Sequence, residues 1–165
     1  MIDIFERISE NFSDSIHELE EAIKIDKTKW KQEIDVNKFY YEIGKYLNKE
    51  VQKTESETVA VMYDGNPYMT FSLALNQISK GKKLVFFVEQ YMLAVNTALL
   101  AIIQKSLIDC NTDESDIKLY NSRNSLLDLI EKQNEFDRVI VLGDKFMFER
   151  VQMHVEIPIT FVQSE

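Results

Sequence analysis

The chain has 165 residues, of which 45% are hydrophobic and 28% charged, and its formal net charge is −9. A chain of this length buries roughly 70% of its unfolded surface, so it can form one domain whose core needs no disulfide or metal. The acidic balance disfavours nonspecific binding to nucleic acids and anionic membranes. The low content of glycine (4 residues) and proline (2 residues) argues against a chain that is rich in linkers.

Two amphipathic helices are predicted at the N-terminus, over residues 2–24 and 36–52, because apolar side chains recur at spacings of three and four. The second helix is rich in aromatic residues, among them Phe39 and Tyr46, and Trp30 precedes it. An aromatic stripe of this kind is typical of a core or of an interface between subunits. The first segment is acidic as well as amphipathic, so it is not a signal peptide.

The central stretch, residues 58–88, predicts a strand, a tight turn, a helix and a second strand. In the turn, Gly65 permits a backbone conformation that other residues avoid, Asn66 is a good helix N-cap, and Pro67 suits the first helical position. Gly81 is well placed to end the helix. The second strand is apolar without alternation, as expected for a strand buried on both faces of a parallel sheet. The stretch therefore predicts a right-handed βαβ unit.

The most apolar helical stretch, residues 91–108, contains Asn96 and Thr97, so it predicts a core helix and not a membrane span. Cys110 follows it in a polar loop. As the single cysteine it excludes an intrachain disulfide and fits a reducing cytoplasm. No His, Lys or Arg adjoins it in sequence to lower its pKa, so we do not expect it to act as a nucleophile.

From residue 58 onward, strands and helices alternate regularly. The predicted elements are strand 58–63, helix 67–79, strand 83–88, helix 91–107, strand 116–120, helix 122–134 capped by Asn121 or Ser122, strand 138–142, helix 145–153 and strand 157–163. The pattern predicts an α/β fold: a three-layer open parallel sheet of about five strands, Rossmann-like, preceded by two N-terminal helices. Pro158 predicts that the last strand lies at the sheet edge. We expect a helical layer (1–53) and an α/β domain (54–165) packed as a single globular unit.

Ligands of such sheets bind at the carboxyl ends of the strands, near the point where the strand order reverses. The candidate cofactor-binding residues that follow three of the strands are Asp64, Gly65, Asn66, Glu89, Gln90, Gly143 and Asp144. The helices after Asn66 and Gly143 could each receive a phosphate at their N-termini, although Gly and Asn are typical of any strand-to-helix turn. No GxGxxG or GxxxxGK[ST] motif follows a strand, which argues against conventional dinucleotide binding and P-loop hydrolysis. Neither His17 nor His154 has a partner at metal-ligand spacing, so no metal site is predicted.

Two runs of sequence resemble the cofactor-binding domain of the aldehyde dehydrogenase superfamily, and they are closest to its γ-glutamyl phosphate reductase branch. They read GNPYMTFSLALNQISKGKKLVFFVEQYMLAVNTALLAIIQKSL and FDRVIVLGDKFMFERVQMHVEIPITFV. The resemblance covers about residues 58–163 and rests on the order and spacing of elements. It implies a Rossmann-like fold and NAD or NADP as the candidate cofactor.

Carried over by position, the resemblance places Asn66 near the family's oxyanion-stabilising Asn and Gly143 by the cofactor phosphates. Other positions depart from the family. Phe87 or Val88 stands where a Lys is usual, Asp144 would repel a phosphate, and Val162 falls about where the general-base Glu should be. The family's catalytic cysteine belongs to a second domain, which this sequence does not include.

Three functions follow as hypotheses. The first is a stand-alone, non-catalytic homologue of the cofactor domain that binds a nucleotide or another protein. The second is the non-catalytic subunit of a split NAD(P)-dependent dehydrogenase, which works with a separate catalytic chain. The third is a scaffold protein that forms a homodimer through its aromatic N-terminal helices. None of the three involves nucleic acid or a membrane.

Overall fold

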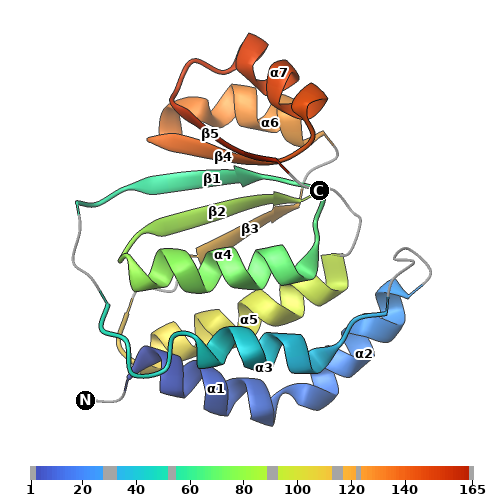
Figure 1. The fold of residues 1–165 in the computed structure, drawn as a ribbon, viewed down its shortest axis with the longest axis vertical. Helices are drawn as coiled ribbons and strands as arrows, with labels where there is room; N and C mark the ends of the chain where they lie inside the picture. The colour runs from blue at the N-terminus through green and yellow to red at the C-terminus, as the bar shows by residue number, and fades with distance from the viewer. Residues whose placement is uncertain are drawn as a thin grey trace.

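The structure, a computed structural model, describes residues 3–27, 33–51, 55–88, 93–112, 117–121 and 124–163. Within these residues, seven α-helices surround one sheet of five strands (Figure 1). In chain order the elements are α1 (Ile4–Asp14), α2 (Ile16–Asp26), α3 (Val36–Gly44), β1 (Thr58–Met62), α4 (Pro67–Ser79), β2 (Lys83–Val88), α5 (Leu93–Asp109), β3 (Ile117–Asn121), α6 (Ser125–Lys132), the 3₁₀-helix η2 (Gln133–Glu135), β4 (Arg138–Gly143), α7 (Lys145–His154) and β5 (Ile159–Gln163).

The five strands form an open sheet in the order β3-β2-β1-β4-β5, and every neighbouring pair is parallel. The predicted Rossmann-like α/β fold is therefore confirmed. The last strand lies at the edge of the sheet, as Pro158 predicted. That proline precedes β5 directly, and its carbonyl accepts a hydrogen bond from the Val139 N–H at 3.0 Å. The chain builds outward from β1 to β3 and then returns to place β4 on the other side of β1, so the strand order reverses between β1 and β4.

The core lies on both faces of the sheet, because alternate residues of each central strand point to opposite sides. Leu84, Phe86 and Val88 of β2 pack into the larger cluster with α4, α5 and the N-terminal helices. Phe87 joins the smaller cluster, which includes Leu129 of α6. Figure 1 shows α6 and α7 on one side of the sheet, and α4 and α5 on the other with α1, α2 and α3 as an outer layer.

The N-terminal layer has three helices, so the prediction of two was wrong. The first predicted helix breaks at Ser15, whose φ of −108° and ψ of 12° end α1 before α2 begins. The second predicted helix ends at Gly44 instead of residue 52, and Asn48 further on adopts a φ of 68°, a left-handed conformation that no α-helix continues through.

The aromatic stripe of α3 packs partly inside the molecule. Phe39 is fully buried, and its ring lies 6.0 Å from Phe12 and 5.4 Å from Phe71, measured between ring centroids. Tyr41 on the same helix is 69% exposed. Trp30 lies outside the described residues. Among the helices described, none combines the length and the apolar character that crossing a membrane requires.

Capping interactions account for two further helix boundaries. Gly81 adopts a φ of 68° just after α4, and its N–H donates to the Ile78 carbonyl, as predicted for a helix-ending glycine. The predicted start of α6 was wrong: Asn124 is its N-cap, with Oδ1 accepting from the Leu127 N–H at 3.1 Å. Asn121 belongs to β3 instead, and Ser122 lies outside the described residues.

Candidate functional site at the carboxyl ends of β1 and β4

The turn after β1 folds as its residues predicted. Gly65 has a φ of 86°, in the region that favours glycine, and the Asn66 N–H donates to Asp64 Oδ1 at 2.9 Å. Asn66 Oδ1 accepts from the Tyr68 N–H at 2.9 Å and so caps α4, which begins with Pro67. Because the oxygen of the Asn66 amide faces the helix, its NH₂ group is the end that can donate to a ligand.

A buried polar network connects this turn to α5. The Asn96 amide of α5 donates from Nδ2 to the Gly65 carbonyl at 2.9 Å, and its Oδ1 accepts from the Thr70 hydroxyl at 2.7 Å. The Thr70 hydroxyl also meets the Tyr63 hydroxyl. Asn96 and Thr70 have no exposed surface and Tyr63 is 6% exposed. Burial, the largest cause, raises the pKa of Tyr63 well above its usual range, so its hydroxyl stays protonated.

The sequence interpretation missed this network. It treated Asn96 as a polar break in an apolar helix, which was a real signal, because an asparagine inside a core helix needs partners for its amide. The partner could not be named, since the Gly65 carbonyl is 31 residues away in sequence.

The turn after β4 is built around a second cap. Asp144 Oδ1 accepts from the Met147 N–H at 2.8 Å, at the N-terminus of α7. Gly143 precedes it, and a Cβ atom there would lie 2.7 Å from Met147 Sδ. A side chain at residue 143 would therefore require the flexible end of the half-buried Met147 side chain to move.

The structure brings the two turns together. β1 and β4 pair in parallel with Met62 opposite Val141, so the residues after each strand leave the same edge of the sheet side by side. Five of the seven predicted site residues meet there, at the point where the strand order reverses; they are Asp64, Gly65, Asn66, Gly143 and Asp144. The other two, Glu89 and Gln90, lie outside the described residues.

This edge carries two exposed carboxylates, and the exposed Lys145 follows the second of them. Asp64 and Asp144 are both exposed, one in each turn. The positive N-terminus of a helix is the usual phosphate site in such sheets. Here each helix supplies its own acceptor: Asn66 caps α4, which also starts with a proline that has no N–H, and the Asp144 carboxylate caps α7. At each helix one N–H is therefore already bonded to a cap, and a phosphate would also approach the two exposed carboxylates.

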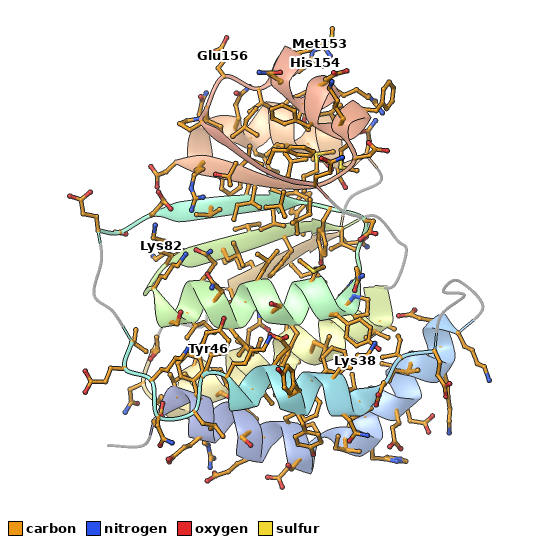
Figure 2. The ribbon with its side chains drawn as sticks, viewed as in Figure 1. Lys38, Tyr46, Lys82, Met153, His154 and Glu156 are labelled. Atoms are coloured by element: carbon orange, nitrogen blue, oxygen red, sulfur yellow. The ribbon has the colours of Figure 1, made fainter. Side chains whose placement is uncertain are left out.

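Other reactive groups do not belong to these two turns. Cys110 follows the last turn of α5, and burial, followed by the nearby Asp109 carboxylate, raises the pKa of its thiol. His17 and His154 are exposed on α2 and α7; Figure 2 labels His154 beyond the sheet, on the side away from the N-terminal helices. In the described part of the chain, no three His, Cys, Asp or Glu side chains gather as a metal site.

The fold and the position of these turns define an open parallel α/β domain of the Rossmann-like class. The structure is similar to γ-glutamyl phosphate reductase from Thermotoga maritima, with a TM-score of 0.79, 15% identity, and 94% of this chain aligned to 46% of that one. The enzyme of the same name from Saccharomyces cerevisiae gives a TM-score of 0.74 and 15% identity, with 95% of this chain aligned to 49% of that one. A glyceraldehyde-3-phosphate dehydrogenase from Methanocaldococcus jannaschii, complexed with NADP, gives a TM-score of 0.67 and 16% identity, with 98% of this chain aligned to 40% of that one.

The sequence itself matches no protein-family model and no curated protein. The predicted resemblance to the γ-glutamyl phosphate reductase branch is confirmed for the fold. The chain spans less than half the length of each of these three neighbours.

Proposed function

We propose that this chain is a non-catalytic domain with an aldehyde-dehydrogenase-like fold, which does not turn over a substrate by itself. The observation that carries the proposal is that the chain's own side chains cap both helices at the strand ends, Asn66 at α4 and the Asp144 carboxylate at α7. The raised pKa of Cys110 adds support, because a thiol with little thiolate at neutral pH is a poor nucleophile.

The first experiment is a calorimetric and thermal-shift titration with NAD, NADP and their reduced forms. We expect no oxidation of NAD(P)H in the presence of aldehydes or acyl phosphates, whether or not the titration shows that a nucleotide binds. A ligand at 100 times its dissociation constant stabilises the native state by about 2.7 kcal/mol, which the thermal shift would detect. A saturable turnover would overturn the proposal.

Nucleotide binding without catalysis is the second candidate. It is supported by the position of the two turns at the reversal of strand order and by the Asn66 NH₂ group, which is oriented away from the helix that it caps. The site would comprise Asp64, Gly65, Asn66, Gly143 and Asp144, with Glu89 and Gln90, which follow β2 in the sequence. Asp144→Asn keeps a side-chain oxygen for the cap and removes the charge. Binding that appears or tightens at least fivefold in this variant would identify the carboxylate as the barrier.

A partner chain or a second copy is favoured by apolar side chains on the outer face of α7. Phe146 is 67% exposed and Met153 is 77% exposed, and Val162 on the neighbouring edge strand is 44% exposed. Figure 2 labels Met153 on the side of the molecule away from the N-terminal helices. Sedimentation over a concentration range tests homodimer formation: Phe146→Ser should weaken a dimer formed through this face, whereas Tyr41→Ser on α3 should not. A chain that stays monomeric at 100 µM would exclude the homodimer and leave a different partner chain as the occupant of this face.

A further inference from the structure

The face of the sheet beneath α6 is not fully covered. α6 has 8 residues and packs over β1 and β2, so the outer strand β3 and the start of β2 keep an open side. A cavity of about 320 Å³ lies there, between the first residues of β1 and β2, the middle of β3 and the chain that follows α6. This volume is at the lower end of the range for small-molecule pockets.

The floor of the cavity is apolar and aromatic. Val85 and Phe87 line it from β2, and Phe136 lines it from the segment between η2 and β4. The Phe87 ring centroid lies 5.4 Å from that of Tyr120 and 5.7 Å from that of Phe136. Phe87 is fully buried, whereas Tyr120 is 37% exposed and belongs to the wall that a ligand would touch. Such a surface suits a flat, apolar group.

The rim of the same cavity is basic. Lys83, Lys118 and Lys132 line it, against a single carboxylate, Glu135. The Lys132 Nζ atom lies 5.2 Å from the centroid of the Tyr120 ring, so one ammonium group is held beside the aromatic wall. This local excess of positive charge contrasts with the net charge of −9 of the whole chain. An ammonium group is a good point-charge partner for phosphate or carboxylate.

We propose that this cavity binds a small aromatic anion, a flat ring that carries a phosphate or carboxylate group and is about the size of a mononucleotide. The ring lies against Tyr120 and the apolar floor, and the acidic group is paired with Lys118 and Lys132. The site is separate from the turns after β1 and β4, because Thr58, at the amino end of β1, lines it. The length of the five-residue strand β1 is about 17 Å.

The experiment is a titration of the ¹⁵N-labelled chain with AMP, followed by two-dimensional NMR. We expect the amides of Val85, Phe87 and Tyr120 to shift in a saturable manner, with weaker binding as salt rises. Adenosine and inorganic phosphate, titrated separately, each contain half of the chemistry and should bind at least tenfold more weakly. Shifts confined to residues around Gly65 and Gly143 would instead assign AMP to the strand-end turns and overturn this proposal, as would no shift at 10 mM AMP.

Lysine variants complete the test. Lys118→Gln and Lys132→Gln should each weaken AMP binding at least fivefold. The matched control is Lys49→Gln, because the Lys49 Nζ atom also lies 5.2 Å from a tyrosine ring centroid, that of Tyr46, but outside the cavity. The control should change the affinity less than twofold. Equal weakening in all three variants would indicate nonspecific charge attraction and refute the site.

Discussion

The substitution Asn96→Ala tests whether the buried network holds the turn after β1. It removes the donor to the Gly65 carbonyl and the acceptor of the Thr70 hydroxyl, at 2.9 and 2.7 Å. Gly65 is buried, and a buried acceptor left without its donor costs about 1–3 kcal/mol. The Thr70 hydroxyl keeps its bond to the Asn66 carbonyl at 3.1 Å, so its lost bond adds about 1 kcal/mol. The expected loss in the free energy of unfolding is therefore about 2–4 kcal/mol.

The assay is urea denaturation followed by circular dichroism. With a denaturant slope of roughly 2 kcal/mol/M, a loss of about 3 kcal/mol lowers the midpoint by about 1.5 M. The matched control is Asn76→Ala on α4, where the amide is only partly buried and donates to the Tyr46 hydroxyl at 3.4 Å. The control should lose less than about 1 kcal/mol. Similar losses in both variants would refute the inference that burial makes Asn96 important.

Three further predictions concern charge, packing and reactivity. The pKa of Glu57 is lowered, first by its hydrogen bond from Lys82, which Figure 2 labels. The ionised Glu57 therefore stabilises the fold above its unfolded pKa, and this stabilisation is lost as the pH falls. Glu57→Gln should make the free energy of unfolding less dependent on pH, as measured by urea titrations between pH 7 and 3. Gly143→Ala should destabilise by no more than about 1 kcal/mol, because the added Cβ meets the flexible end of the Met147 side chain, and Met147→Ala in the same chain should restore part of the loss in thermal unfolding. Cys110 should react with iodoacetamide at pH 7 more slowly than glutathione does, with a rate that rises with pH, because its pKa is raised; a faster reaction would contradict this.

Local chemistry predicted the turn after β1 well. Gly65, Asn66 and Pro67 specify a left-handed residue, a cap and a first helical position, all within three residues. The same reasoning placed Gly81 at the end of α4 and Pro158 next to an edge strand. These features depend on backbone conformation and on hydrogen bonds between near neighbours, which a sequence pattern can express.

What the sequence did not predict depends on contacts between distant segments. Asn11 lies on the buried face of α1, where its amide donates to the Ser106 hydroxyl at 2.9 Å, 95 residues away. The basic cavity under α6 joins side chains from four separate parts of the chain. At the candidate site, the positions of Asp64 and Asp144 were predicted, but their neighbouring placement required the strand order of the sheet.

The position of α5 has a consequence for how the molecule unfolds. This helix of 17 residues packs against the sheet strand β3 and α4 and also against α1 and α2, and its first turn is held by the buried Asp26 carboxylate, which accepts from the Val95 N–H at 2.8 Å. Opening the N-terminal helices would expose its apolar residues to water. We therefore expect the slowest-exchanging amide hydrogens to lie in α5. The amide hydrogens of α1 and α2 that face α5 should exchange through the same global opening as those of the central strands.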